Sequence, residues 1–216
     1  SHRVAAAPRQ QLWLDGFISE ADLTGESSSL GVHFTPSSIA RTLAEETVAN
    51  LNLNRNELVA FDPTCGSAEL LKELVRMLEK TAFSGVVRLY GCDISPTAVA
   101  LARFTLALEC RAHRKFTLKY EIQLGDSLEV IWPEKCDVII MNPPFLRWND
   151  LLDQQKQQVA SVLGVISTRA NYANAFFHRA LDQLTDGGVL AAVAPRAIFE
   201  TSASSATRGL LAERLA

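Results

Sequence analysis

Short apolar runs alternate along this chain with longer segments in which apolar residues recur every three or four positions. The runs cover residues 58–61, 86–90, 117–124, 138–141 and 189–193. Strands that are apolar on both faces are typical of a parallel sheet that helices cover on both sides. The alternation therefore predicts an α/β fold, with a mostly parallel sheet of five strands and helices on both of its faces.

Helical segments fill the spaces between these runs. They begin after residues 35, 67 and 95 and cover residues 151–163, 172–184 and 201–216. Thr35 and Ser95 each precede a proline, and a hydroxyl at the N-cap followed by proline in the first turn is typical of a helix start. Residues 1–30 are less regular, with a possible short helix at residues 10–17.

The composition limits the class of protein. The 216 residues suffice for one domain or slightly more, and 48% are hydrophobic while 21% are charged, which excludes disorder, collagen and coiled coil. No apolar run approaches the roughly 18 residues of a membrane span. The formal net charge is −3, whereas a protein that binds nucleic acid through phosphate contacts alone is usually basic. If this chain binds nucleic acid, groups outside it must therefore supply most of the electrostatic attraction.

The four cysteines do not form a recognisable metal or disulfide pattern. Cys65, Cys92, Cys110 and Cys136 contain no Cys-x-x-Cys pair and have no histidine at zinc-binding spacing. This indicates reduced thiols that pack as small apolar side chains in a cytoplasmic protein, with no metal site. The chain begins without methionine, and we expect it to be a piece of a longer protein.

Four of the five predicted strands end in a turn that carries Asp or Asn. These residues are Asp62, Asp93, Asp126 and Asn142. Because ligands of parallel α/β sheets bind outside the carboxyl ends of the strands, we expect all four along one edge of the sheet. The sequence therefore predicts a ligand site at this edge.

The first three turns each leave two interpretations open. The turn after Asp62 has a single glycine, Gly66, and lacks the motifs of phosphate-binding loops; it either approaches a small ligand or is a tight turn only. Asp93 lies 31 residues after Asp62, where it would accept two hydrogen bonds from a ribose diol or form a local turn ahead of Ser95. Asp126 would accept from the exocyclic amine of adenine or serve as a turn acid.

The segment Asn142-Pro143-Pro144-Phe145 carries the sharpest chemical signal. Two prolines fix the backbone just past a buried strand, so the Asn142 side chain and the Pro143 carbonyl have set directions. Together they offer two acceptors to one conjugated NH2 group and favour a nitrogen with a usable lone pair. Phe145 would stack on the planar group that carries the amine. The alternative is a diproline that merely ends the strand.

Read together with Phe34-Thr35-Pro36, these motifs resemble those of the gamma-class N6-adenine DNA methyltransferases. Such enzymes are the modification proteins of restriction-modification and related phage-defence systems. The resemblance covers about residues 31–216 and implies a Rossmann-like methyltransferase catalytic domain there, with residues 1–30 as a leader segment. It implies direct methyl transfer, without a metal, to the N6 amine of a flipped adenine in DNA. DNA would be bound through a target-recognition region outside this chain or through a separate specificity subunit.

The resemblance also assigns S-adenosyl-L-methionine as cofactor. It implies that Thr35 contacts the methionine part, that Asp62 and Gly66 hold the amino-acid end, that Asp93 binds the ribose, and that Asp126 meets the adenine.

The same resemblance implies that the fourth turn, residues 142–145, binds the target amine. It implies a catalytic segment in which Asn142 and Pro143 hold the amine, Pro144 stiffens the turn and Phe145 stacks on the base.

Two departures from the family pattern affect these expectations. The family usually carries a second glycine in the first turn, where this chain has Ala68; alanine is suitable only if its φ is negative, and cofactor affinity depends on this. The fold normally has seven strands, so five predict a domain that is incomplete at its C-terminus.

Methyltransferases of release-factor glutamine or ribosomal RNA guanine share the Asn-Pro-Pro-aromatic turn, and a non-catalytic cofactor-binding fragment is a further alternative. Phe34-Thr35-Pro36 favours the DNA enzymes.

Overall fold

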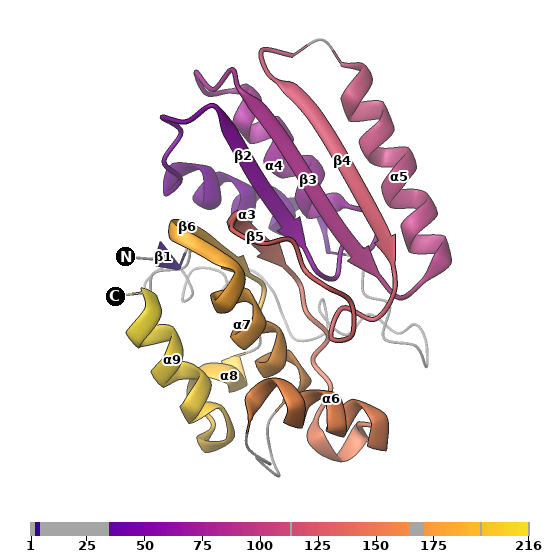
Figure 1. Ribbon diagram of the computed structural model, residues 1–216, viewed down its shortest axis with the longest axis vertical. Helices are drawn as coiled ribbons and strands as arrows, with labels where there is room; N and C mark the ends of the chain where they lie inside the picture. Colours follow the sequence, from indigo (N-terminus) through magenta and orange to yellow (C-terminus); the bar gives the residue numbers. More distant parts are fainter. Residues whose placement is uncertain (1–2, 5–34, 113, 165–170, 195, 216) are drawn as a thin grey trace.

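The computed structural model describes residues 3–4, 35–112, 114–164, 171–194 and 196–215. In these residues six parallel strands form one sheet in the order β1-β6-β5-β2-β3-β4 (Figure 1). The strands are β1 (Arg3–Val4), β2 (Glu57–Asp62), β3 (Val86–Asp93), β4 (Thr117–Leu124), β5 (Cys136–Met141) and β6 (Leu184–Ala192). The predicted parallel sheet is confirmed. The sixth strand is β1, whose two residues are too short for a sequence pattern to indicate.

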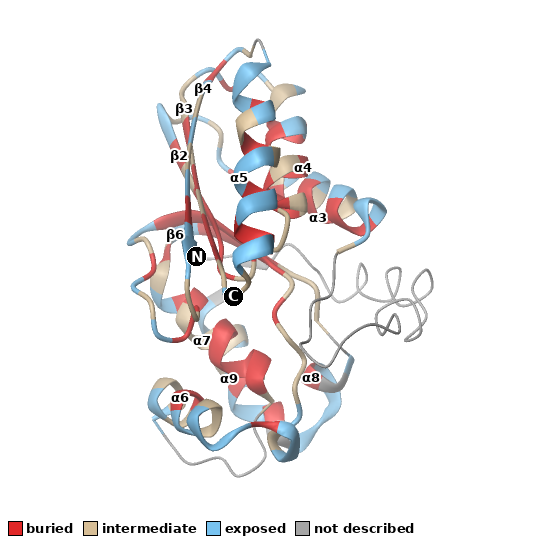
Figure 2. Cartoon of the chain, turned by 90° about the vertical axis from the view of Figure 1, so that its right-hand side faces the viewer, coloured by how far each residue is buried: buried red, intermediate tan, exposed pale blue. Residues whose placement is uncertain are grey.

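Helices lie on both faces of the sheet, as predicted. They are α3 (Ser37–Ala49), α4 (Glu69–Glu79), α5 (Pro96–Arg111), α6 (Asp153–Leu163), α7 (Tyr172–Gln183), α8 (Arg196–Glu200) and α9 (Ser205–Leu215). Helices α3, α4 and α5 cover one face, and α7 lies on the opposite side (Figures 1 and 2). No helix in the described part of the chain is long and apolar enough to cross a membrane. The predicted short helix at residues 10–17 lies outside the described residues.

The central strand β5 explains why the chain has a core on each side of the sheet. All six of its residues are buried. Val138 and Ile140 belong to the cluster formed with α3, α4 and α5, whereas Ile139 and Met141 belong to the cluster formed with α7. Because successive residues of a strand point to opposite faces, one continuous apolar run supplies both cores.

Of the two predicted N-caps, one is confirmed and one is wrong. The Ser95 side chain accepts a hydrogen bond from the Ala98 amide at 3.3 Å, and Pro96 occupies the first turn of α5. Helix α3 instead begins after Pro36 without a side-chain cap. The reason lies elsewhere in the fold, because the hydroxyl of Thr35 accepts a hydrogen bond from the side chain of Asn142.

Strand β6 also differs from its prediction. The apolar run placed this strand at residues 189–193, but it begins at Leu184, so residues 186–188 lie within the strand and form an irregularity. Cys136 pairs with Leu184 and Val138 with Val189, so the pairing advances two residues on β5 and five on β6. Gly187 has φ 73°, a conformation that suits the extra residues of a bulge.

Strand β5 should therefore be sensitive to cavities. We expect Ile139→Ala, at a side chain with 0% exposure, to lower the free energy of unfolding by about 2–5 kcal/mol. Ile131→Ala is the matched control, because that side chain is 90% exposed and its loss should cost less than about 0.5 kcal/mol. Denaturant unfolding of both variants measures the difference. Equal effects would contradict the assignment of β5 to the core.

Candidate functional site

The four polar residues predicted to meet do lie at the carboxyl edge of the sheet. Asp62 and Asp93 end β2 and β3, Asp126 follows β4, and Asn142 follows β5. Strand β2 pairs with both β3 and β5, so Asp62 lies between Asp93 at the end of β3 and Asn142 after β5. The arrangement results from strand order, since β5 follows β4 in the chain but lies beside β2 in the sheet.

Thr64 joins the first and fourth turns. Its amide donates to Asp62 Oδ1 at 2.9 Å, and its hydroxyl lies 3.2 Å from the backbone carbonyl oxygen of Asn142, to which it donates. Nothing in the local sequence indicates this role of Thr64, because its partner is 78 residues away. These bonds hold the Asp62 carboxyl and the Asn142 backbone in one rigid corner.

Asp93 connects the first and second turns. Its Oδ2 accepts from the Gly66 amide at 2.8 Å, and its Oδ1 accepts from the Ser95 amide at 2.9 Å. The second bond is the local turn that the sequence left open as an alternative. Each carboxylate oxygen has a further lone pair, so these bonds leave Asp93 able to accept from a ligand.

Asp126 is engaged on both oxygens as well. Oδ1 accepts from the Leu128 amide at 2.8 Å, and Oδ2 accepts from Gln158 Nε2 at 3.0 Å. Gln158 lies on α6 and also donates to Glu129 Oε1 at 2.7 Å. The sequence carried no signal for Gln158, because its position depends on how α6 packs against the turn.

Two buried acceptor atoms at this edge have no hydrogen-bond partner among the described residues. They are Asp62 Oδ2 at the end of β2 and Asn142 Oδ1 after β5; a third such acceptor, Glu69 Oε1, lies in the first turn of α4. The other end of the Asn142 amide is satisfied, because Nδ2 donates to Thr35 Oγ1 at 3.1 Å. A buried acceptor without a partner is costly. Two of them, in turns that Thr64 joins by hydrogen bonds, indicate a site that is completed by donor groups of a ligand.

The Asp62 carboxyl has an unusual electrostatic environment. Only 1% of the residue is exposed, and burial, followed by the negative charge of Asp93, raises its pKa from 3.8 to about 8 against the opposing effect of the Thr64 hydrogen bonds. Desolvation dominates because a carboxylate loses its hydration when it is buried. A cationic donor at Oδ2 would favour the ionised form.

The first turn contains two residues in the left-handed conformation. Gly66 has φ 51°, and a Cβ built on it would meet no atom within 4 Å, so space is open beside its backbone. Ala68 has φ 64° and is fully buried immediately before α4. The condition stated for an alanine at this position, a negative φ, is therefore not met, because the chain reverses sharply there to enter the helix. Alanine is strained where glycine would not be.

The segment that follows Asn142 packs along the α7 side of the sheet. Pro143 is buried and Pro144 is half-buried. Phe145 and Trp148 are also half-buried and pack against the core cluster that includes α7. The Leu146 carbonyl accepts from the Tyr172 amide at 3.1 Å, which attaches this segment to α7. The aromatic residues thus stay partly accessible next to the amide of Asn142.

Arg179 on α7 stabilises the segment that carries Asp126. Its guanidinium donates to the Ser127 carbonyl at 2.6 Å and to the Val130 carbonyl at 2.9 Å, and it stacks over the Trp132 ring at 4.7 Å. The cation–π contact and the two hydrogen bonds keep this segment in place. No sequence motif pointed to Arg179.

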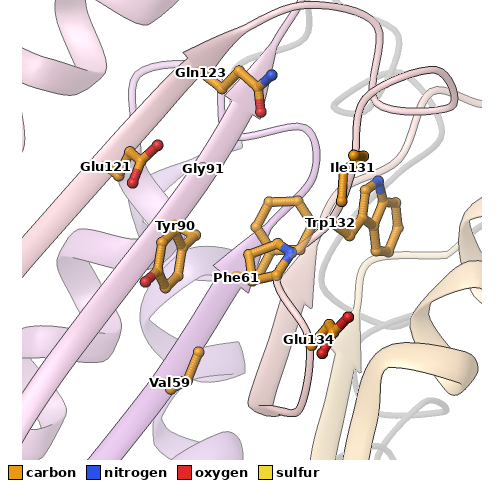
Figure 3. A pocket seen from close by; sticks show the side chains of 10 residues that line it. Val59, Phe61, Tyr90, Gly91, Glu121, Gln123, Ile131, Trp132 and Glu134 are labelled. Carbon is orange, nitrogen blue, oxygen red and sulfur yellow. The ribbon is translucent and has the colours of Figure 1, made fainter.

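A separate cavity of about 310 Å³ lies on the sheet face below this edge, as Figure 3 shows. Phe61, Tyr90 and Trp132 form its aromatic walls, and the exposed Ile131 lies at its rim. It exists because residues 125–135, which connect β4 to β5, contain no helix to cover this face. None of the predicted site residues lines it, so we place the candidate site at the strand ends.

The cysteines do not supply a nucleophile or a metal site among the described residues. All four are free thiols, and no group of three or more His, Cys, Asp or Glu residues is arranged to hold a metal there. Burial raises the pKa of the Cys136 thiol to about 12 and that of Cys65 further. Both therefore stay protonated, unreactive thiols at neutral pH.

A model of the family described as N-6 DNA Methylase matches residues 18–214 of this chain. Type II methyltransferase M.BanIII from Aneurinibacillus aneurinilyticus is 26% identical over 197 residues, which are 85% of this chain and 33% of that protein. The chain thus spans about a third of the length of this curated relative.

Solved methyltransferase structures share the fold. One, a class I S-adenosylmethionine-dependent methyltransferase from Listeria monocytogenes, has a TM-score of 0.68 at 22% identity over 95% of this chain and 58% of that chain. A type I restriction-modification methyltransferase subunit from Streptococcus thermophilus has a TM-score of 0.60 at 24% identity over 83% and 38%. The predicted fold class, a Rossmann-like α/β fold of S-adenosylmethionine-dependent methyltransferases, is confirmed.

The raised pKa of Asp62 makes stability depend on pH. Between about pH 4 and pH 8 the folded chain holds a proton on Asp62 that the unfolded chain has lost. The free energy of unfolding should therefore fall as the pH rises through this range, by at most about 1.4 kcal/mol per pH unit from this group. Asp62→Asn should remove this contribution, whereas Asp153→Asn, at a 95% exposed side chain, should not. Denaturant unfolding across the range compares the slopes; identical slopes in wild type and Asp62→Asn would contradict the assignment.

The strain at Ala68 predicts an unusual tolerance of glycine. Ala68→Gly and Ala44→Gly each remove a fully buried methyl group, but the first releases a left-handed alanine and the second weakens the helix α3. We expect Ala68→Gly to be at least about 1 kcal/mol less destabilising. Thermal and denaturant unfolding provide the measurement, and an equal loss in both variants would show that Ala68 is unstrained.

Proposed function

Because the chain belongs to the N-6 DNA methylase family, we propose that it transfers a methyl group from S-adenosyl-L-methionine to the exocyclic N6 amine of adenine in DNA. The observation that carries the proposal is the unpartnered Asn142 Oδ1. It is a buried acceptor at the carboxyl edge of the sheet, directly before the fixed carbonyl of Pro143.

The target amine needs two acceptors, and this corner offers two. Asn142 Oδ1 and the Pro143 carbonyl would each accept one hydrogen of the N6 amine. The nitrogen gains positive charge as it bonds to the incoming methyl group, and two fixed acceptors stabilise that charge without reorganising. Phe145, half-buried beside them, would stack on the base. An adenine inside a duplex cannot reach this corner, so the base must be flipped out of the helix.

The residues at the other strand ends fit the cofactor. Asp62 Oδ2 is unpartnered and would accept from the ammonium group, next to the open space at Gly66. Thr35 would contact the methionine part, and the remaining lone pairs of Asp93 would accept from the ribose hydroxyls. When bound, S-adenosyl-L-methionine supplies an electrophilic methyl group for direct displacement. The chain contributes mainly position and orientation to that step.

The partner of Asp126 supports a role toward the adenine of the cofactor. Its Oδ2 accepts from the side-chain amide of Gln158 at 3.0 Å, and an amide NH2 resembles the exocyclic amine of adenine in shape and donor geometry. The oxygen of Asp126 that accepts from the Gln158 amide would therefore also accept from the exocyclic amine of the cofactor's adenine. The Gln158 amide would have to share this oxygen or give way.

The DNA-binding surface is assigned to polypeptide beyond this chain. The chain spans about a third of its curated relative and carries a net charge of −3, which gives little attraction to phosphates. A target-recognition region or a separate specificity subunit would supply it. Action on cellular DNA and four free thiols fit a cytoplasmic location.

The decisive variant is Asn142→Ala in the complete polypeptide. We expect the rate of adenine methylation to fall by at least about 100-fold, because one of two amine acceptors is lost, while the dissociation constant of S-adenosyl-L-methionine stays within about twofold. Labelled methyl transfer to DNA and calorimetry measure the two quantities. Asn54→Ala is the control, because Asn54 is exposed near the opposite end of β2.

Three outcomes would contradict the proposal. Wild-type activity in Asn142→Ala would remove the proposed role of the amide. Methylation of a release-factor glutamine or of guanine in ribosomal RNA, without methylation of adenine in DNA, would move the enzyme to another class of amino-methyltransferase. Absence of cofactor binding by the folded wild type would leave a non-catalytic fragment.

A further inference from the structure

Thr35 has an unexpected partner for a residue that precedes a helix. Its sequence context, a hydroxyl before Pro36, is typical of an N-cap. Helix α3 nevertheless begins without a side-chain cap. Thr35 Oγ1 instead accepts from Asn142 Nδ2 at 3.1 Å, across 107 residues of sequence. The hydroxyl therefore binds the side chain of Asn142 in the turn of residues 142–145, called the diproline corner below, and does not cap the helix.

The orientation of the Asn142 amide decides whether this corner can bind an amine. The two ends of an asparagine amide have nearly the same shape, but one accepts hydrogen bonds and the other donates them. With Oδ1 facing the substrate, the corner offers two acceptors. With the amide rotated by half a turn, an NH2 group would face the NH2 of the base. The second arrangement leaves the Pro143 carbonyl as one acceptor and sets an amide donor against the second hydrogen of the amine, so it stabilises the reacting nitrogen less.

Separate contacts fix the backbone and the side chain of Asn142. Its carbonyl accepts from the Thr64 hydroxyl at 3.2 Å, and the preceding residue, Met141, accepts from the Val193 amide at 3.0 Å. The main freedom that remains is rotation of the side chain. Thr35 is the described partner of Nδ2, while Oδ1 is buried and has none.

We propose that Thr35 is a positioning residue for methyl transfer, which accepts from Nδ2 of Asn142 so that Oδ1 faces the target amine. A hydroxyl can also donate, but a rotated amide bound to it through Oδ1 would set its NH2 against the NH2 of the base, so the acceptor use of Thr35 is the arrangement that suits the substrate. This inference rests on the proposed function. It differs from a cofactor contact of Thr35, because it acts on the reacting amine through Asn142. A loss of this bond should therefore lower the turnover number even when the cofactor is saturating.

The test compares Thr35→Val with Thr35→Ser in the complete polypeptide. Thr35→Val keeps the shape and removes the acceptor, and we expect kcat at saturating S-adenosyl-L-methionine and DNA to fall about tenfold. Because Thr35 is also proposed to contact the methionine part, the cofactor dissociation constant is measured separately by calorimetry, and a rise in it does not lower kcat at saturating cofactor. Thr35→Ser restores the hydroxyl and should recover kcat to within about threefold. Thermal unfolding of each variant checks the fold, and Thr35→Ala replaces Thr35→Val if the latter does not fold.

Asn142→Asp provides the matched background. A carboxylate has two equivalent oxygens, so its rotation leaves an acceptor facing the amine either way. Thr35→Val should therefore change the residual kcat of Asn142→Asp by less than about twofold. A tenfold loss there as well would show that Thr35 acts by another route.

The outcomes separate this inference from the proposed function. Adenine methylation by the wild type with unchanged kcat in Thr35→Val overturns the positioning role alone. A weaker cofactor affinity with unchanged kcat overturns it in favour of a cofactor contact. No adenine methylation by the wild type overturns the proposed function and the positioning role with it.

Discussion

The site depends on the parallel pairing of β2 with β3 on one side and with β5 on the other. Asp62 pairs in register with Gly91, and Phe61 pairs with Ile139. Parallel strands end at the same edge, so this pairing brings together turns that are far apart in sequence. Hydrogen bonds from Thr64 and Gly66 then join the turns to one another. If β2 were not the central strand, the Asp62 carboxyl and the Asn142 amide would lie at separate places on the sheet edge.

The same corner contains features that reduce stability. A carboxyl with a pKa of about 8 is buried there, two buried acceptors have no partner in the described chain, and Ala68 adopts a left-handed conformation. Away from such sites, the sequence follows local rules: β5 is apolar throughout and Ser95 caps α5. Local violations that gather at one edge are expected where a fold prepares for a ligand.

Contacts from distant helices complete the site. Gln158 from α6 bonds to Asp126, and Arg179 from α7 holds the carbonyls of the following segment. Neither residue lies in a motif, and a glutamine or arginine on a helix is ordinarily exposed. Their positions follow from the packing of α6 and α7 around residues 126–132.

Several features of the protein were determined by the sequence itself. The apolar runs specified five parallel strands, because a strand buried on both faces needs apolar residues throughout. The polar residues after them specified the edge at which the candidate site lies. The sequence left two uses open for Asp93, and the fold keeps the local turn at Ser95 while adding a bond from Gly66.

Only the tertiary structure decided the partners of these residues. Thr35 carries a local signal for helix capping, yet its hydroxyl binds Asn142, because the order of the strands brings that amide within reach. Strand β1 pairs with β6 through two residues, too few for any periodic pattern. The irregularity of β6 depends on its register with β5. Local preference sets which element forms, whereas a hydrogen bond between residues far apart in sequence exists only after the chain has folded.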